Sequence, residues 1–381
     1  MSQRRYAVIA GGGTAGHVFV ATAIAGALAK GGLGPEDIEL VGSRRGQEAA
    51  LAAGQGYALT LLAGRGIVRR INPDAIVANL GALAGLAWAS ARAVVLLARR
   101  RPKVVVSVGG YASVPAGLAA ALLRVPIVLV NVDATPGAAH RLLGRFAKAS
   151  AVAFAGTPLP HAVVTGAPVR PGLSSIEHSA DRAGLARGAL GVPADRTMVA
   201  VFGGSLGARR LNDAALELAA NYRGRGGLTL FHVTGPRNFE EVCAARAAAG
   251  APGEGEKSGL FYRVVAFEEH MDALYCAADV VVCRAGALTV AELSVAGVAA
   301  VLVPLPGAPG DHQSANAAAL VDAGAAVLLR DEECDGHRLA DCLNALLASP
   351  RQLAAMRQAA DALGRPDAAD AVAALVRAHA G

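Results

Sequence analysis

Two glycine-rich segments stand where a strand is expected to pass into a helix. The first, Gly11–Gly16, matches G-x-G-x-x-G, and the second, Gly203–Gly207, reads Gly-Gly-Ser-Leu-Gly with a hydroxyl at Ser205. Glycine lets backbone N–H groups approach a phosphate, and the partial positive charge at the start of the helix attracts it. One such loop is a weak indication, because a turn can require glycine for its shape alone. Two loops in corresponding places favour phosphate binding.

The segment 283–292 carries a more informative pattern. It follows the apolar run 280–282 and opens a helix through small residues, which favours an anion such as a diphosphate. Glu292 lies further along this helix, and its two oxygens can accept hydrogen bonds from ribose hydroxyls. The alternative is a first-turn acid that complements the helix dipole. The run 311–313, Asp-His-Gln, follows the next expected strand and favours the ligand-binding interpretation.

These segments require two similar α/β frameworks. Short apolar runs alternate with helical stretches, which is typical of βαβ units and a parallel sheet. In the first half we expect a helix at 16–30 and strands at 6–10, 37–42, 104–108, 126–131, 151–154 and 163–165. The polar stretch 172–196 is interpreted as an interdomain linker. The pattern then restarts, with a helix at 208–220 and strands at 198–202, 228–233, 261–265, 280–283, 299–303 and 325–329. The prediction is an α/β protein with two Rossmann-like, doubly wound parallel-sheet domains that face a cleft.

Composition agrees with this architecture. A chain of 381 residues exceeds one ordinary core and fits two domains. It is 54% hydrophobic but only 4% aromatic and has 46 glycines, which indicates a core of Ala, Val and Leu with many tight turns. The five cysteines form no CxxC pair, so we expect reduced core residues and no metal site.

The net charge of +6 suits phosphate-bearing ligands or an anionic membrane surface. No nucleic-acid-binding motif is recognisable, so nucleic acid is not an expected partner. Residues 75–91 approach the length of a membrane span but are rich in Ala and Gly, so we expect a surface or buried helix. Docking at a bilayer and packing in the core are both open for the surrounding segment. Its apolar residues are Ile76, Leu80, Leu83, Leu86 and Trp88, flanked by Arg69, Arg70, Arg92, Arg99, Arg100 and Arg101.

A dinucleotide-binding domain is the first alternative for the amino-terminal half. Such a domain usually has an acidic residue at the end of its second strand to bind the ribose. Here the strand at 38–41 runs into Gly42-Ser43-Arg44-Arg45, which would permit an NADP-dependent oxidoreductase. The second glycine-rich loop and the segment 284–292 count against that class.

Six segments, in this order, resemble the MurG family of glycosyltransferases over nearly the whole chain. They are Gly12–Phe19, Gly109–Tyr111, Thr165–Arg170, Gly203–Ser205, Arg284–Glu292 and Asp311–Gln313. The resemblance implies the GT-B fold. It assigns residues 1–170 to an acceptor-binding and membrane-side domain and 171–350 to a UDP-sugar-binding domain. Residues 351–381 would be a helical segment that packs back across both.

The resemblance also implies the activity. An inverting glycosyltransferase would move N-acetylglucosamine from UDP-N-acetylglucosamine to undecaprenyl-diphosphate-linked N-acetylmuramyl-pentapeptide, which converts lipid I to lipid II in peptidoglycan synthesis. Such an enzyme is cytoplasmic and peripheral on the inner face of the cell membrane. Its partners are the UDP-sugar, a lipid-diphosphate acceptor and an anionic membrane surface. It needs no cofactor, and no essential metal is expected.

Residue roles follow from the same resemblance. On the donor side it implies Arg170 and Ser205 for the phosphates or sugar, the backbone around Phe267 and Glu268 for uracil, Ala287, Leu288 and Thr289 for the diphosphate and sugar, Glu292 for the ribose, and Gln313 for the sugar hydroxyls. On the acceptor side, Thr14, Ala15, Gly16 and His17 would face the acceptor diphosphate and the reacting centre.

The transfer needs a base for the acceptor hydroxyl and positive charge near the departing UDP. His17 and Asp133 are the two candidates for the base. His17 titrates in a suitable range but can also serve as a helix-start residue or phosphate ligand. A loop aspartate such as Asp133 more commonly caps a turn or the following helix.

Three departures from the family pattern lie on the acceptor side. Asn131-Val132-Asp133-Ala134 stands where the family has a Glu-Gln-Asn run, Val20 where it has a proline, and Val114-Pro115 where it has glycine-proline. They leave two further interpretations open. One is a GT-B enzyme with another lipid or natural-product acceptor, and the other is an inactive paralogue that binds sugar nucleotides.

Overall fold

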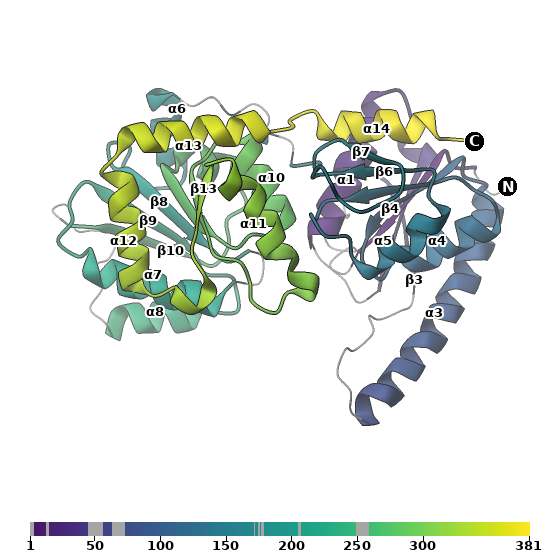
Figure 1. The fold of residues 1–381 in the computed structure, drawn as a ribbon, viewed down its shortest axis with the longest axis horizontal. Helices are drawn as coiled ribbons and strands as arrows, with labels where there is room; N and C mark the ends of the chain where they lie inside the picture. The colour runs from purple at the N-terminus through teal and green to yellow at the C-terminus, as the bar shows by residue number, and fades with distance from the viewer. Residues whose placement is uncertain are drawn as a thin grey trace. The chain divides into compact units, whose positions relative to one another are not determined.

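The computed structural model describes residues 4–12, 15–44, 56–62, 73–170, 172–173, 176, 179–204, 207–248 and 259–381, except the side chains of residues 15, 73–80 and 309. The chain forms two compact units (Figure 1). The first unit comprises Met1–Arg170 and Pro366–Gly381, and the second comprises Pro171–Arg365. Each contains a parallel sheet with helices packed against it, which confirms the predicted fold class.

The first unit holds a seven-stranded sheet in the order β3-β2-β1-β4-β5-β6-β7. The strands are β1 (Ala7–Gly11), β2 (Ile38–Ser43), β3 (Ala58–Leu62), β4 (Val104–Gly109), β5 (Ile127–Asn131), β6 (Ala149–Val152) and β7 (Ala162–Val164). The strand order reverses between β1 and β4, and doubly wound sheets bind ligands beyond the carboxyl ends of strands at such a point. The edge strand β3 was not predicted, because its half-buried sequence lacks a continuous apolar run.

Helices of this unit pack around the sheet. They are α1 (Ala15–Lys30), α3 (Pro73–Arg100), α4 (Ser113–Leu122), α5 (Ala138–Leu143) and α14 (Ala368–Ala378), with the 3₁₀ turns η1 (Pro35–Asp37) and η2 (Gly144–Phe146). The carboxyl-terminal helix α14 lies against α1. Within α3, Gly81–Arg100 is the one stretch of the described chain that is long and apolar enough to cross a membrane. Its stripe of Ala89, Ala93 and Leu97 packs into the core of the unit, as in a helix that covers a sheet.

The second unit repeats the plan with six strands in the order β10-β9-β8-β11-β12-β13. The strands are β8 (Thr197–Phe202), β9 (Leu228–Val233), β10 (Phe261–Val265), β11 (Val280–Cys283), β12 (Ala300–Leu302) and β13 (Ala326–Leu328). The helices are α6 (Ala180–Ala189), α7 (Arg209–Asn221), α8 (Phe239–Ala248), α9 (Met271–Ala277), α10 (Ala287–Val295), α11 (His312–Asp322), α12 (Gly336–Leu347) and α13 (Pro350–Leu363), with the turns η4 (Pro309–Asp311) and η5 (Asp331–Glu333). Here the order reverses between β8 and β11.

The predicted linker at 172–196 is wrong for its central part, because residues 180–189 form α6. The Ser179 hydroxyl caps this helix by accepting a hydrogen bond from the Arg182 N–H at 3.2 Å. No residue of α6 is fully buried, so it lacks the apolar period by which a helix is recognised in a sequence. Polar contacts and packing against α9 hold it instead.

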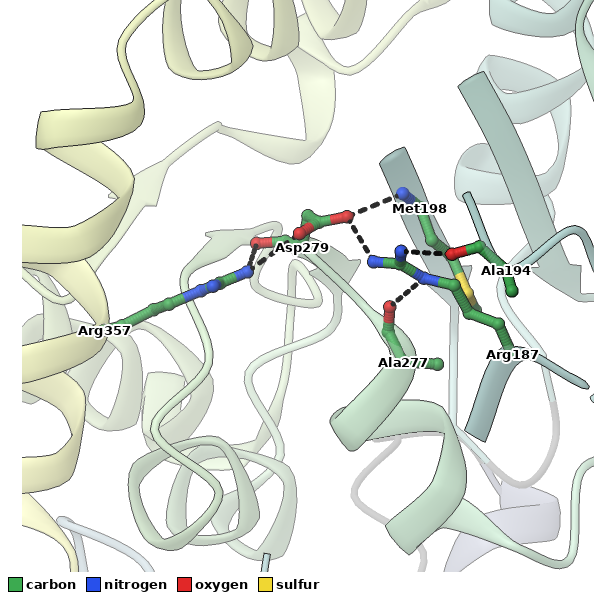
Figure 2. Close-up of polar contacts among 6 residues, drawn as sticks. All are labelled: Arg187, Ala194, Met198, Ala277, Asp279 and Arg357. Carbon is green, nitrogen blue, oxygen red and sulfur yellow. Dashed lines mark hydrogen bonds and ion pairs between the residues drawn. The ribbon is translucent and has the colours of Figure 1, made fainter. Parts of the chain in front are cut away.

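One of these polar contacts centres on Asp279, just before β11 (Figure 2). Its Oδ2 accepts hydrogen bonds from the Met198 N–H and the Arg187 guanidinium, both at 2.8 Å. Its Oδ1 accepts one from Arg357 at 3.1 Å, and Arg187 also donates to the Ala277 carbonyl at 3.0 Å. A single carboxylate thereby joins α6, α13 and the amino ends of β8 and β11.

We expect Asp279→Asn to lower the free energy of unfolding by about 2 kcal/mol, because two partly buried arginines lose their shared counter-charge. Chemical denaturation measures the change. The matched control is Glu241→Gln, which breaks the exposed Arg209–Glu241 pair and should cost less than about 1 kcal/mol. An equal loss in both variants would contradict the role assigned to Asp279.

Candidate functional site

In the first unit the carboxyl ends of β1 and β4 approach each other backbone to backbone. Gly110, directly after β4, has a φ of +74°, and a Cβ at this position would lie 2.1 Å from the Gly12 carbonyl oxygen. Only glycine fits at such a distance. The first glycine-rich loop is therefore placed by contact with a second loop from the neighbouring strand.

Two histidines lie against Gly109, the last residue of β4. A Cβ on Gly109 would lie 3.1 Å from His17 Nε2 and 3.3 Å from His140 Cε1. His17 comes from the first turn of α1 and is half-buried, whereas His140 comes from α5 and is buried. The structure thus brings the predicted His17 to the strand ends together with a histidine that the sequence analysis missed. A single histidine in an apolar helix is hard to distinguish from a core residue by its spacing.

His140 is held by polar groups of two strands. Its Nδ1 lies 3.0 Å from Asn131 Oδ1, at the end of β5, and its Nε2 lies 3.2 Å from the Ser107 carbonyl oxygen in β4. Burial and the nearby His17 lower the pKa of His140 to about 4, and the hydrogen bond to Ser107 opposes this in part. The ring is therefore neutral near pH 7, and it lies beside His17 at Gly109.

The second candidate base, Asp133, lies two residues beyond β5 and is half-buried. The Asn131 side chain donates from Nδ2 to the Asp133 carbonyl oxygen at 2.5 Å. The N-cap of the following helix α5 is Gly137, so Asp133 does not cap that helix. The departure from the family pattern at Asn131 is thus part of one cluster with His140 and the Asp133 backbone.

Among the other predicted acceptor-side residues, Thr14 lies outside the described residues. Ala15 and Gly16 are the first two residues of α1, where helix N–H groups lack intrahelical partners. Arg170 was predicted to contact the donor. Its guanidinium stacks over the Phe19 ring of α1, with 4.8 Å between the guanidinium carbon and the ring centroid.

We expect Gly110→Ala to lower the free energy of unfolding by about 2 kcal/mol or more, because the methyl group meets the Gly12 backbone. Gly26→Ala is the control in the same unit. Nothing lies within 4 Å of its Cβ position in α1, so this change should stabilise the protein by about 0.5–1 kcal/mol. Denaturant titration of both variants measures the difference, and a neutral Gly110→Ala variant would refute the proposed backbone contact.

The second unit shows the same close approach at its glycine-rich loop. Ser205 lies outside the described residues, but Gly207 has a φ of +76° and its Cβ position is 2.1 Å from the Thr234 carbonyl oxygen beyond β9. Asn212, in the first turn of α7, donates to the same carbonyl at 3.1 Å. One close backbone approach and one side-chain hydrogen bond therefore hold the end of this loop against the end of β9.

A buried chain of hydrogen bonds supports this arrangement. His232 Nε2 lies 3.0 Å from Asn212 Oδ1, and His232 Nδ1 lies 2.9 Å from the Tyr262 hydroxyl. Burial lowers the pKa of His232 to about 3, so the ring is neutral. It donates from Nε2 to Asn212 and accepts from Tyr262, which satisfies every member of the chain.

The segment 283–292, which was predicted to bind an anion, opens a helix as expected. Gly286 is the N-cap of α10, and Ala287, Leu288 and Thr289 make its first turn, with N–H groups that need an external acceptor. Gly286, Leu288 and Thr289 are half-buried at this turn, whereas Ala287 is buried.

Arg284 lies just before this turn, and no separate role was predicted for it from the sequence. It is buried, donates to the Val303 and Pro304 carbonyls at 3.1 and 3.2 Å, and pairs with Asp331 at 2.5 Å. Gln313 closes the same loop, since its Oε1 accepts from the Leu305 N–H at 2.9 Å. The loop after β12 is thereby fixed beside α10.

The predicted uracil-side segment lies between β10 and α9. Glu268 Oε1 accepts a hydrogen bond from the His270 N–H at 2.7 Å, just before α9 begins, whereas the Phe267 side chain is exposed. The Glu268 carboxylate therefore stabilises its own loop. Uracil binding by the backbone around Phe267 and Glu268 stays a prediction.

Glu292 is only 3% exposed and is the sixth residue of α10. The alternative of a first-turn acid is therefore wrong, because the first turn of α10 contains no acidic residue. A carboxylate at this depth needs polar partners. The Tyr275 hydroxyl of α9 donates to Glu292 Oε2 at 2.9 Å, a contact that the sequence did not reveal. The described residues contain no group of three or more His, Cys, Asp or Glu side chains arranged to hold a metal ion.

Two doubly wound units with glycine-rich loops at their strand reversals, and a helix start at Gly286 that precedes a buried glutamate, are features of the GT-B fold, and the matched family makes the chain a glycosyltransferase. Residues 7–152 match the glycosyltransferase family 28 N-terminal domain, and residues 198–372 match the glycosyltransferase family 28 C-terminal domain. These matches exclude the NADP-dependent alternative.

Individual relatives identify the family within this class of glycosyltransferases. UDP-N-acetylglucosamine–N-acetylmuramyl-(pentapeptide) pyrophosphoryl-undecaprenol N-acetylglucosamine transferases from Desulforudis audaxviator and Acidothermus cellulolyticus are 38% and 39% identical to the chain. The alignments cover 98% of both chains in the first case and 97% of both in the second. The crystal structure of Acinetobacter baumannii MurG superposes with a TM-score of 0.76 at 30% identity, covering 99% of each chain. The chain belongs to the MurG family, as its sequence motifs indicated.

Proposed function

We propose that this protein transfers N-acetylglucosamine from UDP-N-acetylglucosamine to undecaprenyl-diphosphate-linked N-acetylmuramyl-pentapeptide, the step from lipid I to lipid II. The observation that carries the proposal is nearly full-length identity of 38–39% to transferases of that name. The glycine-rich sequences after β1 and β8 and the helix start at Gly286 support the proposal, because segments of this kind suit phosphate groups.

The donor binds the second unit in this proposal. The start of α10 accepts the diphosphate, Glu292 binds the ribose hydroxyls, and Gln313 stands at the sugar. Ser205 and Arg170 act on the phosphates or sugar, and the backbone near Phe267 and Glu268 binds uracil. As the bond between the sugar and UDP breaks, helix N–H groups and Arg170 stabilise the charge that develops on the diphosphate, without an essential metal ion.

The acceptor binds the first unit, where Thr14, Ala15 and Gly16 face its diphosphate. We assign the base to His17, because its ring lies at the carboxyl end of β4 and imidazole is the side chain that most often acts as a general base. It takes the proton of the acceptor hydroxyl while that oxygen attacks the anomeric carbon, with inversion. Asp133 is the alternative base, and its loop is ordered by Asn131.

UDP release from UDP-N-acetylglucosamine, measured with and without a lipid I analogue, tests the reaction. We expect release only with the analogue, at a rate unchanged by a metal chelator. His17→Ala should lower kcat by about 10²–10⁴-fold with little change in donor affinity, since general-base catalysis contributes that much. His337→Ala, an exposed histidine of α12, is the matched control.

Other outcomes separate the alternatives. Donor binding with release only to a different lipid or natural-product acceptor would replace the acceptor assignment. Donor binding with no release to any acceptor would indicate an inactive paralogue. A full-strength His17→Ala variant would move the role of base to Asp133, to be tested as Asp133→Asn.

The same proposal places the enzyme in the cytoplasm, peripheral on the inner face of the membrane. The supporting surface is the outer face of α3, where Trp88 is 62% exposed and Leu83 is 52% exposed near Arg92 and Arg99. Exposed aromatic and aliphatic side chains beside arginines suit an anionic bilayer. Arg69 and Arg70 lie outside the described residues, and the side chains of Ile76 and Leu80 are not described.

We expect flotation with vesicles rich in phosphatidylglycerol and weak flotation with neutral phosphatidylcholine vesicles. The Leu83→Ser, Trp88→Ser variant should bind anionic vesicles about tenfold more weakly, because it removes the apolar groups that enter the bilayer. Leu185→Ser removes a leucine of α6 that is more exposed than Leu83, and it should leave flotation unchanged. Flotation that is insensitive to the α3 changes would disprove docking through this helix.

A further inference from the structure

Tyr275 is a fully buried residue of the second unit that has no role in the proposed mechanism. It is fully buried in α9, and its hydroxyl donates to Glu292 Oε2 at 2.9 Å. Its ring packs edge to face against Phe202, with 6.2 Å between centroids and an interplanar angle of 73°. Phe202 is the last residue of β8, directly before Gly203 and Gly204.

These contacts connect three parts of the second unit. Tyr275 belongs to the helix that follows the loop at Glu268, its hydroxyl contacts Glu292 in α10, and its ring contacts the strand that leads into the glycine-rich loop. In the proposed donor site these parts face the uracil, the ribose and the diphosphate. Tyr275 therefore contacts two of these parts directly and belongs to the helix that follows the third.

Tyr275 is the donor in this hydrogen bond and Glu292 is the acceptor, so the bond restricts the orientation of the Glu292 side chain. A carboxylate on a helix can rotate about its side-chain bonds, and a bond from a fixed phenol selects one orientation. This fixed orientation prepares the side chain of Glu292 to accept hydrogen bonds from ribose hydroxyls before the nucleotide arrives, which reduces the cost of ordering on binding.

We infer that Tyr275 is a positioning residue for donor recognition: through its hydrogen bond it orients Glu292 toward the ribose of a uridine nucleotide. This inference rests on the proposed function, because it takes the donor to be a UDP-sugar. It adds that discrimination for the ribose depends on a residue that does not touch the ligand.

The test compares UDP with 2′,3′-dideoxy-UDP, which lacks both hydroxyls that Glu292 would bind, by calorimetric titration of the full-length protein. We expect Tyr275→Phe to weaken UDP binding about tenfold and to change dideoxy-UDP binding less than about twofold. Phenylalanine keeps the ring contact with Phe202, so the fold is preserved. In turnover assays the KM for UDP-N-acetylglucosamine should rise by a similar factor while kcat changes little.

Two further variants complete the design. In a Glu292→Gln background, adding Tyr275→Phe should change UDP affinity less than about twofold, because the two residues act as one unit. Tyr222→Phe removes a buried hydroxyl that donates to Asn344 at 2.8 Å elsewhere in the unit, and it should leave both nucleotides unaffected.

Equal weakening of UDP and dideoxy-UDP by Tyr275→Phe would assign the tyrosine to fold stability alone and overturn the inference. Unchanged UDP binding in this variant would overturn it as well. Failure of the proposed function gives a different result. The unaltered protein would then not bind UDP, or would bind UDP and dideoxy-UDP equally. Either result would contradict the donor-site assignment and the inference that rests on it.

Discussion

Close approach of backbone to backbone at the carboxyl ends of parallel strands is the constraint on which the rest of this structure depends. In the first unit Gly110 meets the Gly12 carbonyl, and in the second Gly207 meets the Thr234 carbonyl. A side chain at either position would separate two strand-end loops. The glycines therefore do more than permit a phosphate to approach, because they also pack the loops that would receive it against each other.

Buried polar side chains then hold these loops at defined distances. His140 and His232 are kept neutral by burial, so each can join strands without placing a charge in the core. Glu292 carries its carboxylate into a similar depth and is matched by a phenol. The arginine-rich contact at Asp279 does comparable work at the amino ends of the second sheet. Each unit is thus tied by polar groups at specific points and by an aliphatic core elsewhere.

One acceptor-side departure from the family pattern, Asn131, is explained by its contacts in this structure. Asn131 does not stand alone at the end of β5, because its amide contacts both His140 and the Asp133 carbonyl. The substitution is part of a local network that determines where the Asp133 backbone lies. On the other side, Ala287, Leu288 and Thr289 open α10, and Glu292 occupies a buried position in the same helix.

The sequence by itself determined the two-domain α/β plan, the positions of most strands along the chain and the helix start at Gly286. Short runs rich in apolar and β-branched residues mark the strands, and β9, β10 and β11 have the predicted bounds. It did not reveal the edge strand β3 or the polar helix α6, whose residues lack an apolar period. Only the tertiary structure decided that His140 lies beside His17 and that Tyr275 donates to Glu292. Such pairs join separate secondary-structure elements, and local spacing carries no record of which elements pack together.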